Sequence, residues 1–189
     1  MRVTGVEELL ELLDGVFEGR VDSTSRAASE HWDGILLREG HPLNTELPDA
    51  RRRTEAVEFL EVDFLREEVP GGPYDLVYDS GCFHHLAPHR RLSYVKALRE
   101  VLAPGGYFGI CTFTAGLMGS DEPDDVLMRS GRLGEGVGYT EVELDEMFSW
   151  LELVDSGPMA KYGANANNPV FTQDFLTVAL FRNPAKAAA

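Results

Sequence analysis

The sequence predicts an α/β fold in which helices cover a sheet that contains parallel strands. Two continuous apolar runs, residues 74–78 and 107–113, are separated by an amphipathic segment at residues 90–102. A strand, a helix and a second strand in this order form a right-handed crossover, which makes the two strands parallel. The chain has 189 residues, of which 43% are hydrophobic and 26% charged, as in one globular domain. We therefore expect a single domain over residues 1–189.

The first fifty residues predict an amino-terminal helical segment. Apolar side chains recur at helical spacing among glutamates over residues 9–17. A weaker helix follows over residues 23–37 with Trp32 on its apolar side, and a loop begins near His41. This segment, residues 1–50, precedes an α/β core at residues 51–182 and a frayed tail at residues 183–189.

The core elements follow from apolar runs separated by turn residues. The sequences PGGP at residues 70–73 and PGG at residues 104–106 predict turns, and Thr140 with Glu143 forms a capping box that begins a helix. Residues 116–138 are rich in Gly and Asp and predict a long loop or a short helical lid beside a site. The expected strands cover residues 57–62, 74–78, 107–113, 151–154 and 175–181, and the expected core helices cover residues 90–102 and 140–148.

Charge and composition disfavour several kinds of partner. Asp and Glu outnumber Lys and Arg by 32 to 17, so the formal net charge is −15 and no nucleic acid partner is expected. The first fifteen residues lack a signal-peptide pattern and no run reaches membrane-spanning length, so we expect a cytoplasmic protein without membrane contact. Cys82 and Cys111, in stretches predicted as adjacent buried strands, lack metal-ligand spacing. They are expected to be free thiols, and no metal site is expected.

The candidate site follows the strand at residues 74–78. In an open α/β sheet, ligands bind outside the carboxyl ends of parallel strands, and residues 79–85 form such an end. Either His84 or His85 could orient or deprotonate a nucleophile near neutral pH, while the other could be a packed residue at a helix start. His89 is expected to face solvent.

Three segments together resemble class I S-adenosylmethionine (SAM) dependent methyltransferases. They are YDLVYDSGCFHHL at residues 74–86, ALREVLAPGGYFGICTF at residues 97–113 and GYTEVELDEMF at residues 138–148. The combination is similar to small-molecule enzymes of the thiopurine and tellurite-resistance branches, over about residues 51–182. The resemblance implies a Rossmann-like sheet, mostly parallel with an antiparallel last strand. It also implies SAM as cofactor and a small-molecule acceptor.

The resemblance implies roles for individual residues around the cofactor. Asp63 would approach the adenine with Phe64 beside the ring, although Asp63 could instead cap the following turn. Asp79, Ser80 and Gly81 would flank the methionine part of SAM.

Other residues would lie on the acceptor side. Trp32 and the stretch from His41 to Asp49 resemble the amino-terminal lid of the family, although Trp32 could instead anchor its helix in the core. Cys82 and Phe83 are expected on the substrate side of the same loop.

One diagnostic element of the family is absent from the sequence. The family has a first strand that runs into a glycine-rich loop of the E/D-x-G-x-G type, and a second strand that ends in an acidic residue that binds the ribose. In this sequence the lid-like segment and the core segment that resemble the family follow each other directly near Ala50, without these two strands between them. Three explanations are open: an omitted segment, a partner that supplies the first two strands, or a fold that has lost SAM. A complete chain would expose an apolar sheet edge and is expected to form a homodimer.

The leading functional hypothesis is SAM-dependent methyl transfer to a small-molecule acceptor. One alternative is a SAM-independent enzyme of the cyclase or isomerase type, with His84, His85 and Asp79 as its acid–base groups. The other is a non-catalytic, methyltransferase-like dimeric binding protein.

Overall fold

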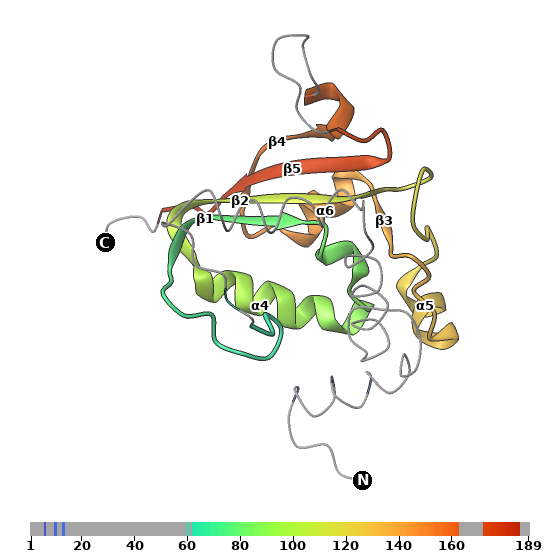
Figure 1. The fold of residues 1–189 in the computed structure, drawn as a ribbon, viewed down its shortest axis with the longest axis horizontal. Helices are drawn as coiled ribbons and strands as arrows, with labels where there is room; N and C mark the ends of the chain where they lie inside the picture. The colour runs from blue at the N-terminus through green and yellow to red at the C-terminus, as the bar shows by residue number, and fades with distance from the viewer. Residues whose placement is uncertain are drawn as a thin grey trace, which may run out of the picture.

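A five-stranded sheet organises the described part of the molecule (Figure 1). The structure is a computed structural model that describes Val6, Leu10, Leu13, Leu60 and residues 62–162 and 172–185. The strands are β1 (Tyr74–Ser80), β2 (Leu102–Thr114), β3 (Gly138–Tyr139), β4 (Glu152–Pro158) and β5 (Leu176–Arg182). The α-helices are α4 (Arg91–Val101), α5 (Asp124–Ser130) and α6 (Glu141–Met147), and the 3-10 helices are η1 (Phe83–His85), η2 (Pro88–Arg90) and η3 (Met159–Tyr162).

The direction of the strands confirms the predicted sheet. The order is β1-β2-β5-β4, and β3 pairs with β2. Strand β1 runs parallel to β2, joined by the crossover through α4, and β2 runs parallel to β3. Strand β5 lies antiparallel between β2 and β4. The sheet is therefore mostly parallel with an antiparallel last strand.

Two expected elements differ from the structure. The turn at residues 104–106 forms part of β2, where the ladder steps from the pair Tyr74–Leu102 to the pair Leu76–Tyr107 and leaves four residues looped out. A Cβ on Gly106 would lie 2.9 Å from the Ala103 carbonyl oxygen, so this loop requires glycine. The strand expected at residues 57–62 is wrong at Leu60 and Val62, which are not in a strand. Its other residues lie outside the described part.

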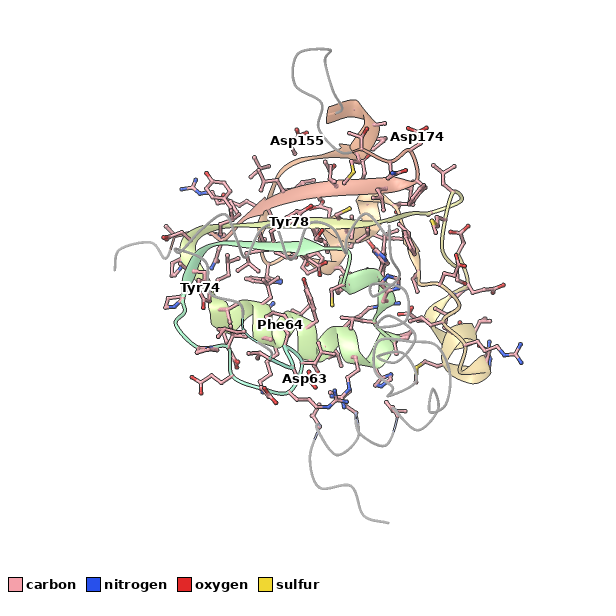
Figure 2. The ribbon with its side chains drawn as sticks, in the orientation of Figure 1. Asp63, Phe64, Tyr74, Tyr78, Asp155 and Asp174 are labelled. Carbon is pink, nitrogen blue, oxygen red and sulfur yellow. The ribbon has the colours of Figure 1, made fainter. Side chains whose placement is uncertain are left out.

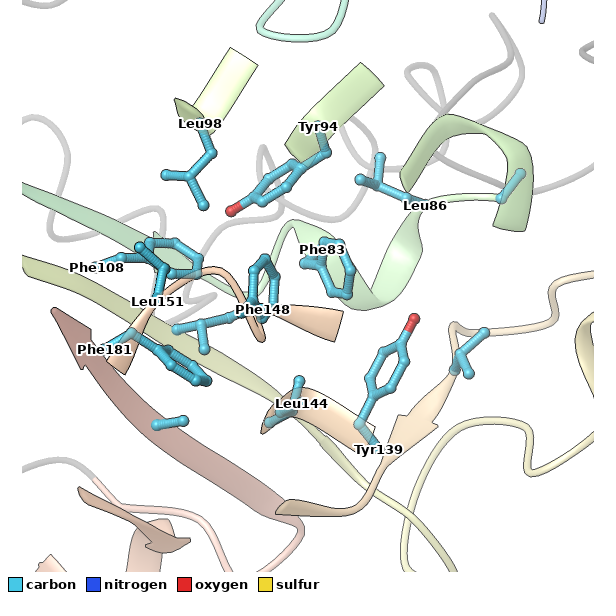
Figure 3. Packing of buried hydrophobic residues seen from close by; sticks show 14 of the residues in the cluster. Phe83, Leu86, Tyr94, Leu98, Phe108, Tyr139, Leu144, Phe148, Leu151 and Phe181 are labelled. Atoms are coloured by element: carbon cyan, nitrogen blue, oxygen red, sulfur yellow. The ribbon is translucent and has the colours of Figure 1, made fainter. Parts of the chain in front are cut away.

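The main core lies between one face of the sheet and helices α4 and α6 (Figure 3). Phe83, Phe108, Phe148 and Phe181 are fully buried, and the ring centroids of Phe108 and Phe148 are 5.1 Å apart. Burial of each such ring contributes about 1.5–3 kcal/mol. A smaller cluster, Cys111, Phe113 and Leu176, packs on the other face. Towards β1 that second face is open, since Leu76 and Tyr78 are 63% and 60% exposed.

The segment at residues 116–138 and the helix that follows it match the sequence reasoning. Of the long loop and the short helix that were expected at residues 116–138, the structure has the short helix, α5. Thr140 then begins α6 through the predicted capping box, because its hydroxyl accepts a bond from the Glu143 N–H at 3.2 Å while the Glu143 carboxylate accepts one from the Thr140 N–H at 2.8 Å.

Candidate functional site

Asp79 organises the loop at the carboxyl end of β1. Its Oδ1 accepts hydrogen bonds from the N–H groups of Gly81 at 2.8 Å and Cys82 at 2.6 Å. Its Oδ2 accepts one from the Phe83 N–H at 3.1 Å and one from the Tyr94 hydroxyl at 2.6 Å. Asp79 is buried, and hydrogen bonds to a charged group contribute about 1.5–3 kcal/mol each. Four donors therefore fix the course of this loop and the start of η1.

The same carboxylate keeps its neighbours protonated. Burial, followed by the charge of Asp79, raises the pKa of Tyr94 well above its usual value. Protein groups around the Cys82 thiol desolvate it, and the carboxylates of Asp79 and Asp63 add to this effect, so the pKa of Cys82 rises to about 12. The prediction that Cys82 lies in a buried strand is wrong, because it is exposed in the loop after β1. Its thiol is protonated at neutral pH and is a poor nucleophile.

The structure separates the two candidate histidines. His84 is 3% exposed and stacks on Phe113, with ring centroids 3.8 Å apart. Burial, and after it the charge of His85, lowers the pKa of His84 to about 3, although a hydrogen bond with the Cys111 backbone acts in the opposite direction. The Nδ1 atom of His84 has no hydrogen-bond partner. His84 is therefore the packed, neutral residue. His85 is only half-buried, and its ring centroid lies 4.1 Å from that of His84.

Residues before β3 pack against this histidine pair. The Val137 N–H donates to the His84 carbonyl oxygen at 2.8 Å. Gly136 adopts a φ of +134°, and a Cβ there would lie 2.8 Å from the same oxygen and 3.1 Å from His85 Nδ1. Strand β3 holds this segment in place by pairing Gly138 with Phe113. The carboxyl ends of β1 and β2 and the approach to β3 thus meet at His84 and His85.

Three basic residues lead into α4 from the same edge of the sheet. His89, Arg90 and Arg91 are 7%, 0% and 9% exposed, so the prediction that His89 faces solvent is wrong. The reason is that η2 continues directly into α4 and places these side chains against the body of the protein. Arg91 Nη1 donates to both Asp124 carboxylate oxygens, at 2.7 and 2.9 Å, and its guanidinium lies 5.4 Å from the centre of the Tyr139 ring.

Arg91 and Tyr139 were not recognised from the sequence. Two adjacent arginines at the start of an amphipathic helix are typical of a solvated face, and no local spacing marks one of them as buried. Tyr139 lies within GYTEVELDEMF, which supported the family resemblance and the following helix but gave this residue no role. A longer-range clue, the Asp-rich stretch at residues 121–125, carries the partner of Arg91 but does not specify it.

Asp63 and Phe64 lie beside α4 (Figure 2). The Asp63 carboxylate accepts a bond from the Leu65 N–H at 3.0 Å and pairs with Arg66 at 2.9 Å, so it does cap the following turn. Phe64 contacts Tyr94 edge to face, with centroids 5.2 Å apart. The charge of Asp63 is the smallest of the three causes that raise the pKa of the Cys82 thiol.

A cleft of about 500 Å³ lies between α4 and the segment at residues 64–73. Its lining extends from Phe64 and Ser93 to Val101 and Pro73. Because Pro73 precedes β1 and Val101 ends α4, the cleft leads toward the amino end of β1. It runs away from the histidine pair, and Phe64, the residue predicted to lie beside the adenine, is part of its lining.

The remaining predicted residues have different positions. Ser80 is exposed at the end of β1, and Gly81 follows it with a φ of +98°. Phe83, expected on the substrate side, is fully buried against Tyr94 and Tyr139, so it supports the loop from below. Trp32 and His41 lie outside the described residues.

The described residues form neither a membrane span nor a metal centre. No helix there combines the length and apolar character needed to cross a membrane. In the same residues, no group of three or more His, Cys, Asp or Glu side chains is arranged to hold a metal ion.

Comparison of the sequence with protein families and with curated proteins finds no match. Among solved structures, 1,6-didemethyltoxoflavin-N1-methyltransferase of Burkholderia thailandensis, with bound 1,6-didemethyltoxoflavin and S-adenosylhomocysteine, matches with a TM-score of 0.51 and 24% identity over 77% of this chain and 58% of that one. NodS, an N-methyltransferase of Bradyrhizobium japonicum, has a TM-score of 0.49 and 16% identity over 75% of this chain and 62% of its own. TehB of Haemophilus influenzae has a TM-score of 0.44 and 16% identity over 75% of this chain and 45% of its own.

The likeness to the Burkholderia enzyme carries the assignment of the fold, since the other two TM-scores are below 0.5. This chain spans less than two thirds of the length of each of these proteins. The directions of the described strands agree with the sheet that the sequence resemblance implied, which was mostly parallel with an antiparallel last strand. The protein has the Rossmann-like fold of class I SAM-dependent methyltransferases.

Proposed function

We propose that this protein transfers a methyl group from SAM to a small-molecule acceptor. The observation that carries the proposal is the loop after β1, which Asp79 fixes at the carboxyl end of a sheet of the methyltransferase type. Ligands of open α/β sheets bind at this end. The half-buried His85 lies on the same loop beside neutral His84.

Methyl transfer from SAM depends mainly on the positioning of the acceptor, and the protein forms no covalent bond to the substrate. SAM, when bound, supplies an electrophilic methyl group that an acceptor oxygen or nitrogen attacks in line. His85 is the residue that we assign to orient the acceptor or to take its proton. His84 remains neutral at physiological pH and forms an apolar wall with Phe113.

The described residues fit part of the cofactor. Asp63 uses each carboxylate oxygen once, for the Leu65 N–H and for Arg66, so each oxygen retains an acceptor position that suits the adenine amino group. Phe64 supplies an aromatic ring beside it, and Ser80 with Gly81 would flank the methionine part. The glycine-rich loop and acidic ribose ligand of the family do not occur in the sequence, so cofactor affinity is the decisive quantity.

Calorimetric titration of SAM and S-adenosylhomocysteine into the purified protein tests the proposal, with intact mass recorded on the same sample. We expect micromolar or tighter binding. The variant Asp63→Asn should weaken it, whereas Asp75→Asn, at an exposed position on β1, should leave it unchanged. A folded protein of the correct mass that binds neither compound would overturn the proposal.

A SAM-independent acid–base enzyme is the second candidate. The contact between His84 and His85 beside a loop fixed by Asp79 supports it, as does the absence of the glycine-rich sequence. Activity that does not depend on added SAM would favour this candidate. The third candidate, a non-catalytic dimeric binding protein, and the expected homodimer stay predictions that sedimentation tests. A clean monomer would count against both.

A further inference from the structure

Arg91 keeps one edge of its guanidinium unpaired inside the protein. The residue is 9% exposed at the first position of α4. Its Nη1 donates to both oxygens of Asp124, but Nε and Nη2 are buried and have no hydrogen-bond partner. A buried donor of a charged group without a partner destabilises the folded protein more than a neutral donor does. A folded protein that tolerates two such donors on one side chain calls for an explanation.

The geometry of the free edge indicates a ligand. Nε and Nη2 share one side of the planar guanidinium and present two parallel N–H groups, which match the two oxygens of a carboxylate. The Tyr139 ring lies against the guanidinium and holds its plane, with 5.4 Å from Cζ to the ring centre. The Tyr139 hydroxyl is a further buried polar group without a partner. Three unpaired polar atoms therefore belong to two side chains in contact.

The start of α4 is compatible with an anionic ligand. Arg90 is buried immediately before Arg91, and the first turn of α4 contains no acidic residue. The amino end of this 11-residue helix adds a partial positive charge. Asp124 faces Arg91 from α5 and is the carboxylate paired with its Nη1.

The pair of Arg91 and Tyr139 belongs to the same edge as the candidate site. Tyr139 pairs with Thr114 in the ladder between β3 and β2, and Val137, two residues earlier, donates to the His84 carbonyl oxygen. Phe83, beside His84, packs on Tyr139 with centroids 5.5 Å apart. Arg91 therefore contacts Tyr139, which lies at the carboxyl end of β2 and packs on Phe83 in the loop after β1.

We propose that the Nε/Nη2 edge of Arg91 binds the carboxylate of a ligand of this site through two parallel hydrogen bonds. The inference rests on the proposed function, in which that carboxylate belongs to the acceptor or to the amino-acid end of SAM. Both nitrogen atoms are out of contact with solvent, so a ligand reaches them only when a neighbouring segment moves aside. The Asp124 side chain at the start of α5 is 59% exposed, and its pair with Nη1 uses a different edge of the guanidinium.

Nuclear magnetic resonance of the Arg Nε–H groups in the full-length 15N-labelled protein tests the proposal. The Arg91 signal is assigned by its loss in Arg91→Lys. Three probes are titrated separately: benzoate, S-adenosylhomocysteine, and 5′-methylthioadenosine, which lacks the amino-acid end. A shift of the Arg91 signal with benzoate supports an acceptor carboxylate. A shift with S-adenosylhomocysteine but not with 5′-methylthioadenosine supports the cofactor carboxylate.

Two variants separate recognition from general charge. Arg91→Lys keeps the positive charge but removes the paired N–H groups, so the dissociation constant of the responding probe should rise about tenfold or more. Arg129→Gln, at a 71% exposed arginine paired with Asp125, is the matched control and should leave that constant unchanged. Backbone amide spectra of both variants verify that they are folded.

The outcomes distinguish this inference from the proposed function. If S-adenosylhomocysteine binds but neither it nor benzoate moves the Arg91 signal, the carboxylate site is refuted and the methyltransferase proposal stands. If benzoate moves the signal and S-adenosylhomocysteine does not bind, the carboxylate site stands and the methyltransferase proposal fails. Absence of any response refutes both.

Discussion

Acidification should destabilise the protein through His84, because this histidine is buried as a neutral group. A histidine in the unfolded chain has a pKa of about 6.5, whereas the pKa of His84 in the folded protein is about 3. Between these values the unfolded state binds a proton that the folded state does not bind. Stability therefore falls as the pH drops from about 6.5 towards about 3, and His84 alone accounts for a loss of about 2 kcal/mol between pH 7 and pH 5.

Urea unfolding of the wild type and of His84→Gln at pH 7 and pH 5 measures this contribution. Glutamine does not titrate, yet its amide can still donate a hydrogen bond toward the Cys111 backbone. The other histidines are the same in both proteins, so the difference between their pH dependences isolates His84. The wild type should lose about 2 kcal/mol more than the variant. Equal losses, within about 0.5 kcal/mol, would refute the argument that His84 is neutral because it is buried.

Three further substitutions test the local structure. Tyr94→Phe removes the hydroxyl that donates to Asp79 at 2.6 Å and should lower the free energy of unfolding in urea by about 1.5–3 kcal/mol, so an unchanged midpoint would contradict the role of this bond. Gly136→Ala should lower the melting temperature more than Gly134→Ala, because only the former places a Cβ against backbone; equal effects would argue against the packing at the histidine pair. Thr140→Ala removes the helix cap and should cost about 0.5–2 kcal/mol in urea unfolding, and no loss would mean that the capping box is dispensable.

The sheet could be predicted from the sequence because buried parallel strands are apolar along their length. The runs around Val77 and Phe108, with an amphipathic helix between them, predicted β1, α4 and β2. The reverse direction of β5 came from the family resemblance alone, because the apolar pattern of a strand does not encode its direction. The strand expected at residues 57–62 failed at Leu60, which is 49% exposed. A short apolar run becomes a strand only where a neighbour pairs with it.

The location of the candidate site could be predicted from the sequence, but the environments of its ionisable side chains could not. The position of His84 and His85 after a strand end located the loop, but only packing against Phe113 shows which of the two is neutral. Burial of Arg91 could not be read locally, because its partner Asp124 lies 33 positions away in the chain. The environment of an ionisable side chain depends on such long-range neighbours, which a single sequence does not specify.

Asp79 fixes the backbone of the loop after β1 without using the side chains of the loop residues that it bonds. Asp79 binds the backbone N–H groups of Gly81, Cys82 and Phe83, which every residue except proline possesses. Cys82 contributes only its backbone N–H to these bonds, and its side chain takes no part in them. Other side chains at position 82 can therefore replace the thiol while the backbone keeps its course, so the loop can evolve towards new ligands without loss of its fold.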